Sequence, residues 1–143
     1  MPQTPAETAD RIVVRKVRRE LRLLRDGRTI RSYHIALGRT PIGPKEREGD
    51  GKTPEGNYTI SGRNPRSKFH LALRISYPEA RDRERAAHLN IPPGGDIMIH
   101  GLPNERSVAH PSDWTEGCIA VTNPEIEEIW HLVPNGTPVL IEP

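Results

Sequence analysis

The chain of 143 residues is long enough to bury a hydrophobic core, and 34% of its residues are hydrophobic although only 4% are aromatic. Its 21 basic and 19 acidic residues are interleaved and leave a net charge of +2, which does not indicate a nucleic-acid-binding patch. A single cysteine excludes an intramolecular disulfide. The fifteen prolines and twelve glycines predict many turns and argue against a helical bundle.

The first nine residues are rich in Pro, Thr and Ala, and we expect residues 1–9 to form a disordered arm. This segment has neither a basic n-region nor an apolar h-region, so we expect no signal peptide there. No apolar run approaches the ~18 residues that a membrane-spanning helix needs. We expect one domain over residues 10–143, because the chain has no internal repeat and the length of a single domain.

The first half of this domain has the pattern of β-strands. Alternating or β-branched apolar residues predict strands over 11–17, 20–23, 29–37, 57–60 and 69–75. The Asp26–Gly27 pair predicts a hairpin turn between the second and third of these strands. Residues 38–56 and the basic residues 63–68 are expected to be loops, and the charges of Lys45–Glu48 are expected to be solvated. In the second loop, Arg66 is a candidate ligand for a substrate carboxylate, although ordinary surface charge is the commoner alternative.

The second half contains two expected helices and short strands. Residues 78–90 have the composition of an exposed helix. A second helix is expected to begin at Asn123 as the N-cap, and its apolar face consists of Ile126, Ile129, Trp130 and Val133. We expect this helix to pack on the sheet with Trp130 in the core. Residues 137–141 form the last expected strand, and the chain is therefore expected to be mainly β with a few short helices.

Two reactive side chains stand at the ends of expected strands, each beside a glycine. The apolar run Ile97–Ile99 leads to His100 and Gly101, and eighteen residues after His100 comes Cys118, preceded by Gly117 and followed by a second apolar run. Glycine permits positive φ or close approach at such positions. A thiol and an imidazole that meet in this way can act as a nucleophile and its general base.

Two other interpretations of these residues stay open. A lone cysteine is more often a small buried hydrophobic residue than a nucleophile. A zinc site of His100, His110 and Cys118 has suitable N and S ligands, but its spacing matches no usual zinc pattern. We expect no metal site.

The segment from Ile97 to Asn123 resembles the active-site segment of the L,D-transpeptidase catalytic domain family, cysteine enzymes of bacterial peptidoglycan. Members carry an apolar strand that ends in His-Gly or His-Ser and, after a gap of this size, Ser-His-Gly-Cys and an apolar residue. The matching residues are His100, Gly101, Gly117, Cys118 and Ile119. Thr115 stands at the serine position, Glu116 where many members have a second histidine, and Ala120 where many have Arg or Asn. The stretch from Asp113, D-W-T-E-G-C-I-A-V-T-N, resembles a subgroup of murein L,D-transpeptidase-like proteins.

The resemblance implies a β-sandwich of the L,D-transpeptidase catalytic domain type. It also implies that Cys118 is the nucleophile and that His100 is the general base and then the acid. The orienting partner of the imidazole would be the Gly101 carbonyl, with Asp113 or Glu116 as the alternatives.

Further site residues follow from the same resemblance. The main-chain N–H groups of Gly117 and Cys118 are the expected oxyanion donors. Contacts with substrate are expected from Arg66, Asp113, Trp114, Thr115 and Glu116. No cofactor is required.

The implied substrates are peptidoglycan stem peptides, cleaved at the carbonyl of their third residue. Transfer of the acyl group to an amine makes the protein a transpeptidase, and transfer to water makes it a carboxypeptidase or endopeptidase. A non-catalytic peptidoglycan-binding module is the third alternative. The family implies work in the periplasm or cell envelope. The sequence does not set the oligomeric state, and a monomer is the simplest expectation.

Overall fold

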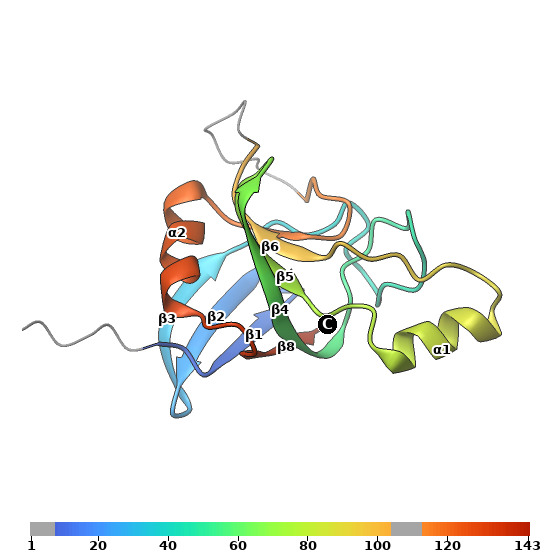
Figure 1. Ribbon diagram of the computed structural model, residues 1–143, viewed down its shortest axis with the longest axis horizontal. Coiled ribbons are helices and arrows are strands. Elements are labelled where there is room, and N and C mark those ends of the chain that lie inside the picture. The colour runs from blue at the N-terminus through green and yellow to red at the C-terminus, as the bar shows by residue number, and fades with distance from the viewer. Residues whose placement is uncertain (1–7, 104–112) are drawn as a thin grey trace, which may run out of the picture.

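A computed structural model describes residues 8–103 and 113–143 of the chain, and eight strands of this part form a single mixed sheet (Figure 1). The order of the strands across the sheet is β3-β2-β1-β8-β4-β5-β6-β7. The strands are β1 (Arg11–Arg15), β2 (Glu20–Arg25), β3 (Arg28–His34), β4 (Gly56–Ser67), β5 (His70–Ile75), β6 (Met98–His100), β7 (Ile119–Ala120) and β8 (Pro138–Glu142). The two helices are α1 (Ala80–His88) and α2 (Asn123–Leu132).

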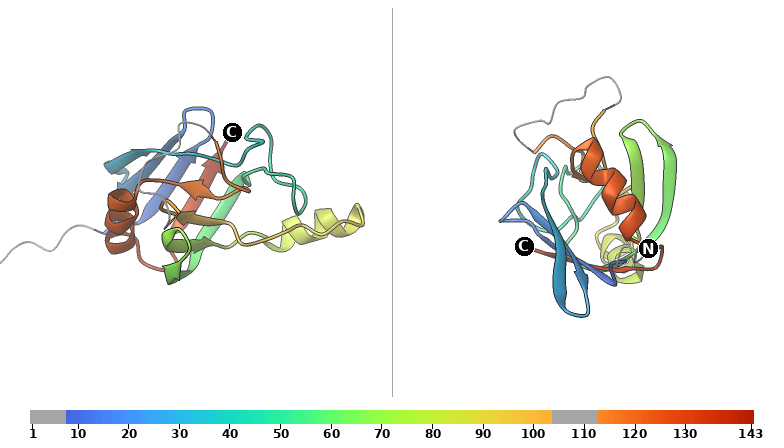
Figure 2. Two further views of the ribbon diagram at one scale, coloured as in Figure 1. Left: turned by 90° about the horizontal axis from the view of Figure 1, so that it is seen from above. Right: turned by 90° about the vertical axis from the view of Figure 1, so that its left-hand side faces the viewer.

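The sheet folds back on itself at the long strand β4. Gly56–Thr59 at the start of β4 pair with β8, whereas the part from Ile60 onward pairs with β5, so β4 belongs to both halves. The far edges of the two halves also meet, because Ala36 and Ala120 exchange two main-chain N–H···O bonds of 2.9 Å. Helix α2 lies across the opening between the halves, and α1 lies at the opposite end of the molecule (Figure 2). The expected β-sandwich fold, mainly β with a few short helices, is confirmed.

The core lies between the two halves of the sheet and under α2. Alternate residues of β1 and β2 point inward, as their sequence pattern predicts, and Ile12, Val14, Leu21 and Leu23 are fully buried. These side chains pack in one cluster with apolar residues of β4 to β8 and with the inner face of α2.

Helix α2 differs from its expected form in two details. Its N-cap is Thr122, which forms a capping box with Glu125, while the side chain of Asn123 accepts a hydrogen bond from Leu102 N–H at 2.8 Å. Trp130 is half-buried at the edge of the core and not within it. The Arg63 guanidinium lies 4.7 Å from the centre of the Trp130 ring, so a cation–π contact stabilises the ring at this partly open position.

Two charged segments are more ordered than the sequence suggests. Residues 63–68 are mostly strand and not loop, because β4 continues to Ser67 across two irregularities of its pairing with β5. Lys45 is not solvated: only 3% of its surface is exposed, and its ammonium lies 2.9 Å from the Asp50 carboxylate. Asp50 also accepts three main-chain N–H bonds. Burial alone would raise the pKa of Asp50, but these bonds and the contact with Lys45 outweigh it and hold the pKa at about 2. The composition of the segment does not reveal that Lys45 and Asp50 pair with each other and with the main chain.

The expected N-terminal arm falls mostly on residues 1–7, which lie outside the described residues. Ala9 is described and is 2% exposed, and its N–H donates to the Leu132 carbonyl at 2.7 Å. In the described ranges, neither helix has the length and apolar character required to cross a bilayer.

Candidate active site

His100 is the last residue of β6, and Cys118 directly precedes β7, the strand that pairs with β6. Strands β6 and β7 are parallel, with Ile99 opposite Ile119 and His100 opposite Ala120. Ile99 and Ile119 are fully buried in the core, and the alternation of side chains along a strand therefore assigns their neighbours His100 and Cys118 to the opposite face. With a strand spacing of ~4.8 Å and an offset of two residues, or ~6.6 Å, the Cα atoms of His100 and Cys118 are expected to lie roughly 8 Å apart.

The His100 ring is held in one tautomer. Its Nδ1 lies 2.7 Å from the Gly101 carbonyl oxygen, which can only accept, so Nδ1 carries the hydrogen and Nε2 has a free lone pair. The residue is 2% exposed, and this burial lowers the pKa of His100 to about 4 against the weaker opposing effect of the bond to Gly101. At neutral pH the imidazole is therefore an uncharged base.

Two aromatic rings surround the imidazole. The Phe69 ring is stacked on it, with 4.3 Å between the ring centres and 19° between the planes. The Trp114 ring centre lies 5.7 Å from the centres of both His100 and Phe69. These contacts account for the burial of a polar side chain that lies outside the main core.

The thiol of Cys118 is oriented by main-chain groups of the segment that leads into β6. Its Sγ accepts a hydrogen bond from Met98 N–H at 3.4 Å and donates to the Asp96 carbonyl oxygen at 3.3 Å. Burial raises the pKa of Cys118 above its usual value of 9.0, although the Met98 N–H acts in the other direction. The lowered pKa of His100 and the raised pKa of Cys118 thus leave both the imidazole and the thiol uncharged in the resting protein at neutral pH.

A short turn before Cys118 is organised by the Thr115 hydroxyl. Thr115 Oγ1 donates to the Cys118 carbonyl at 2.6 Å and accepts Gly117 N–H at 3.1 Å. In the resting protein the Gly117 N–H is therefore bound to Thr115 Oγ1, and its role as an oxyanion donor stays a prediction. Within residues 8–103 and 113–143, the Cys118 N–H donates no main-chain hydrogen bond.

Gly117 is required by its conformation and by close packing. It has a φ of +129°, and a Cβ at this position would lie 2.7 Å from the Lys52 carbonyl oxygen. Gly101 is equally enclosed, because a Cβ there would lie 2.5 Å from Asn123 Oδ1 and 3.0 Å from the Phe69 oxygen. The two glycines noted in the sequence thus let neighbouring chain segments close around the site.

The structure separates two of the expected site residues from His100. The Asp113 carboxylate binds Arg19 through three contacts of 2.7–3.1 Å and accepts Leu37 N–H at 2.9 Å. Glu116 forms an ion pair of 2.9 Å with Arg39, with 71% of its side chain exposed. Neither carboxylate contacts the imidazole, so the Gly101 carbonyl is the orienting partner that the geometry supports.

Arg66, the candidate carboxylate ligand, is remote from the reactive pair in sequence and lies at the molecular surface. Arg66 lies exposed near the end of β4, where its N–H donates to Asn64 Oδ1. His110 of the zinc alternative lies outside the described residues. Within the described part of the chain, no cluster of three or more His, Cys, Asp or Glu could hold a metal ion.

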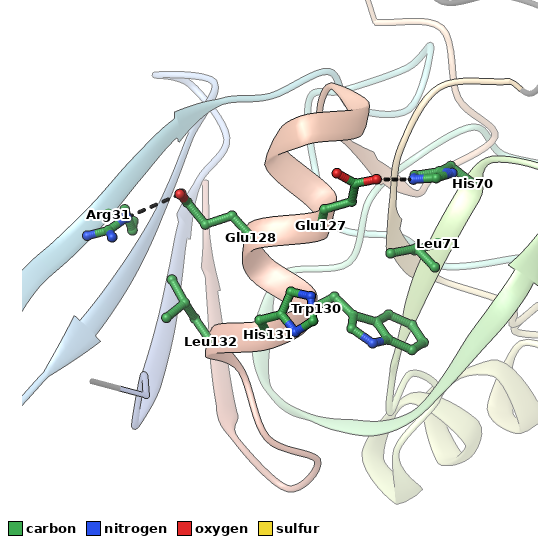
Figure 3. Close-up of a pocket in the computed structure, with 8 residues that line it drawn as sticks. All are labelled: Arg31, His70, Leu71, Glu127, Glu128, Trp130, His131 and Leu132. Carbon is green, nitrogen blue, oxygen red and sulfur yellow. Dashed lines mark hydrogen bonds and ion pairs between the residues drawn. The ribbon is translucent and has the colours of Figure 1, made fainter. Parts of the chain in front are cut away.

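A groove of about 620 Å³ lies elsewhere, along the outer face of α2 (Figure 3). It is lined by Arg31, His70, Leu71, Glu127, Glu128, Trp130, His131 and Leu132. Neither His100 nor Cys118 borders it, so this groove is not the reactive site.

Sequence reasoning missed three contributors to the site. Phe69 was expected only as part of a strand, and its contact with His100 is visible only after β5 pairs with β6. The main-chain groups of Met98 and Asp96 carry no side-chain signal that could have identified them. The apolar run before His100 was the available clue, since it brings a strand edge beside the cysteine.

Comparisons with known proteins identify the family of the domain. A model of the L,D-transpeptidase catalytic domain matches residues 9–141. YafK of Escherichia coli K12, a candidate L,D-transpeptidase, is 35% identical over 104 residues, which cover 71% of this chain and 36% of YafK.

Solved structures have the same fold. The helical cell shape determining protein Pgp2 of Campylobacter jejuni has a TM-score of 0.75 and 26% identity, over 96% of this chain and 48% of that one. Bd1075 of Bdellovibrio bacteriovorus has a TM-score of 0.69 and 26% identity, over 99% and 50% of the two chains. An L,D-transpeptidase of Xylanimonas cellulosilytica, at 18% identity and a TM-score of 0.64, supports the fold alone. The chain thus spans half or less of the length of YafK, Pgp2 and Bd1075.

Proposed function

Because this chain belongs to the L,D-transpeptidase catalytic domain family, we propose that it is a cysteine acyltransferase that acts on peptidoglycan stem peptides. The observation that carries the proposal is the orientation of His100. Its Nδ1–H is bound to the Gly101 carbonyl, which leaves Nε2 as a base on the same face as Cys118. A histidine that served only to fill the core would not need a fixed free lone pair beside the chain's single thiol.

In the proposed first step, Cys118 Sγ attacks the carbonyl carbon of the third stem residue, usually a diaminopimelate. The thiol proton moves to His100 Nε2 as the S–C bond forms. The C–N bond to the next residue then breaks, and the imidazolium returns the proton to the departing amine. The product is a thioester on Cys118 with the imidazole neutral again.

Two local groups support this step. The Cys118 N–H is open to bind the oxyanion of the tetrahedral intermediate. The Met98 N–H already points at Sγ and would stabilise the sulfur as its proton leaves. The thiol proton, which points to the Asp96 carbonyl at rest, has to turn toward Nε2 before attack.

In the second step, an acceptor attacks the thioester carbonyl and Nε2 takes its proton. An amine acceptor gives a new amide and hence transpeptidation. Water gives a free acid, and the protein would then be a carboxypeptidase or endopeptidase of the same family. In both cases the thiolate that leaves recovers its proton from the imidazolium.

Hydrolysis is a second candidate because of two residues beside the nucleophile. Ala120 is buried and has no side-chain hydrogen bond to offer an acceptor, and the Glu116 carboxylate is engaged by Arg39. An amine outcompetes water only when it is held and oriented. We therefore expect appreciable release of tripeptide.

The test is to incubate the purified protein with disaccharide-tetrapeptide and to resolve the products by mass, with Cys118→Ala as the matched control. Cross-linked dimers would indicate transpeptidation and tripeptide would indicate hydrolysis. Dimers with no tripeptide would contradict the expected hydrolysis. If wild type and Cys118→Ala both leave the substrate unchanged while the protein still binds peptidoglycan, the domain is a binding module.

The place of action and the role of the whole protein are part of the same proposal. A domain that acts on peptidoglycan works in the periplasm or cell envelope. Pgp2 is a cell shape determining protein, and by analogy this chain would remodel peptidoglycan in a way that affects cell shape.

A further inference from the structure

Phe69, the only phenylalanine of the chain, contacts the base of the site directly. Its ring covers one face of the His100 imidazole at a centre-to-centre distance of 4.3 Å and nearly parallel, at 19°. Trp114 meets both rings at 5.7 Å and at angles of 50° and 58°. A ring stacked this closely restricts rotation of the imidazole about its side-chain bonds and removes water from one of its faces.

The same residue also holds the main chain that orients the base. The Phe69 carbonyl oxygen accepts Gly101 N–H at 2.9 Å, and the Gly101 carbonyl in turn accepts His100 Nδ1–H at 2.7 Å. Phe69 thus acts on His100 at two points, once on the ring and once through the residue that fixes the tautomer. A small displacement of Phe69 would therefore shift both the His100 ring and the Gly101 carbonyl that binds it.

Phe69 is itself fixed by the turn between β4 and β5. Its N–H donates to Ser67 Oγ at 2.9 Å. The next residue, His70, has a φ of +73°, a conformation that non-glycine residues rarely adopt. The His70 imidazole lies 2.8 Å from a carboxylate oxygen of Glu127 in α2, and Figure 3 shows the two side chains pointing toward each other. The turn is therefore held from both sides and presents the ring in a defined place.

We propose that Phe69 is a positioning residue for His100, which keeps the imidazole plane aligned so that Nε2 faces the thiol. Phe69 does not touch the reacting atoms and acts through His100. The catalytic consequence rests on the proposed function. The positioning itself is a property of the resting protein and can be measured without substrate.

The experiment compares Phe69→Leu and Phe69→Met with wild type. Met retains much of the side-chain volume without the ring, and so provides a folded variant if Leu disturbs the turn. Trp130→Leu is the matched control, because it removes another half-buried aromatic ring that contacts Arg63 and does not contact His100. The His100 ring signals are followed by NMR from pH 3 to 8, and His100→Gln identifies them. Steady-state kinetics with disaccharide-tetrapeptide are measured in parallel.

We expect the pKa of His100 to rise from about 4 toward its ordinary value of 6.5 in both Phe69 variants, because the imidazole gains contact with water. We expect kcat to fall about tenfold or more while KM changes little, because the base loses alignment and substrate binding does not. Phe69→Tyr, which keeps the ring, should restore most of both values. Trp130→Leu should change neither.

An unchanged His100 pKa in both Phe69 variants would overturn the proposal. Equal effects of Trp130→Leu would also overturn it, because they would indicate general loosening of the fold. If wild type turns over no stem peptide, the proposed function fails, but the NMR titration still decides whether Phe69 positions the ring.

Discussion

Met98 N–H donates to Cys118 Sγ at 3.4 Å, across the pair of strands that also brings His100 to the site. The Asp96 carbonyl takes the thiol hydrogen on the same side. The sulfur is therefore oriented by main-chain dipoles and not by a charged side chain. This arrangement, together with the buried imidazole, makes the resting site electrically neutral, and it leads to specific expectations for its pH dependence.

The reactivity of the thiol should follow its raised pKa. Only the thiolate reacts with iodoacetamide, so we expect the alkylation rate to rise about tenfold per pH unit from pH 6 to 8.5. The midpoint should lie above 9.0, because burial disfavours the thiolate. The rate is measured by intact mass over time, with Cys118→Ala as the unreactive control. A rate that is already constant between pH 5 and 7 would indicate a preformed thiolate–imidazolium pair and would contradict the neutral resting state.

The stability of the protein should fall as the pH decreases from 6.5 to 4. The folded protein keeps His100 neutral down to about pH 4, whereas the unfolded chain binds a proton on this residue below pH 6.5. The unfolded state thus binds more protons in this range, and stability rises with pH, by about 3 kcal/mol across the window from this group. Urea unfolding at pH 7 and pH 4.5 checks the sign.

His100→Gln is the control for this effect, because Gln is polar and does not titrate. We expect a shallower loss of stability between the two pH values in this variant. Asp50, with a pKa of about 2, titrates below the window and does not interfere. An identical pH dependence in wild type and variant would show that His100 does not carry the effect.

Asp113 should prove to be a structural residue and Glu116 a dispensable one for folding. Asp113 is partly buried and joins Arg19 to the Leu37 main chain, so Asp113→Ala should lower the free energy of unfolding by about 1–2 kcal/mol. The exposed pair of Glu116 and Arg39 is screened by solvent, and Glu116→Ala should cost less than about 0.5 kcal/mol. Urea unfolding of both variants at pH 7 provides the comparison. Equal losses of stability in the two variants would contradict the structural role of Asp113.

Gly117 should tolerate no side chain. In Gly117→Ala, the new Cβ would meet the Lys52 carbonyl at 2.7 Å in a left-handed backbone, so we expect a loss of more than about 1 kcal/mol of stability and a displaced nucleophile. Gly62→Ala is the matched control, since a Cβ there has no neighbour within 4 Å. Thermal unfolding and the alkylation rate of Cys118 are measured for both. A wild-type melting temperature and alkylation rate in Gly117→Ala would show that the turn before Cys118 can accommodate a Cβ.

The parts of the fold that follow from local pattern could be predicted from the sequence. Alternating and β-branched residues predicted β1 and β2, and the Asp26–Gly27 pair predicted the hairpin between β2 and β3. The spacing of Ile126 and Ile129 predicted the buried face of α2. These features depend on neighbours in sequence. The pairing of β1 with β8 and the fold-back at β4 depend on residues far apart in the chain, and no local signal specifies them.

The candidate site divides in the same way. His100 and Cys118 were identifiable because each combines a reactive side chain with a strand end and a glycine. The sequence could not decide which group orients His100, because the Gly101 carbonyl and the carboxylates of Asp113 and Glu116 can all accept a hydrogen bond. Only the structure shows which of them lies next to the imidazole. The burial of Lys45 was missed because the sequence does not show that Lys45 pairs with Asp50, five residues further along the chain.

The most direct test of the account is to detect the acyl-enzyme. The protein is mixed with disaccharide-tetrapeptide, quenched with acid after milliseconds to seconds, and examined by intact mass and peptide mapping, with Cys118→Ala and His100→Gln in parallel. We predict an adduct with the mass of the disaccharide-tripeptide acyl group on Cys118 of wild type, no adduct on Cys118→Ala, and slower formation in His100→Gln. Turnover by Cys118→Ala at the wild-type rate, or an adduct on any other residue, would contradict the proposed nucleophile.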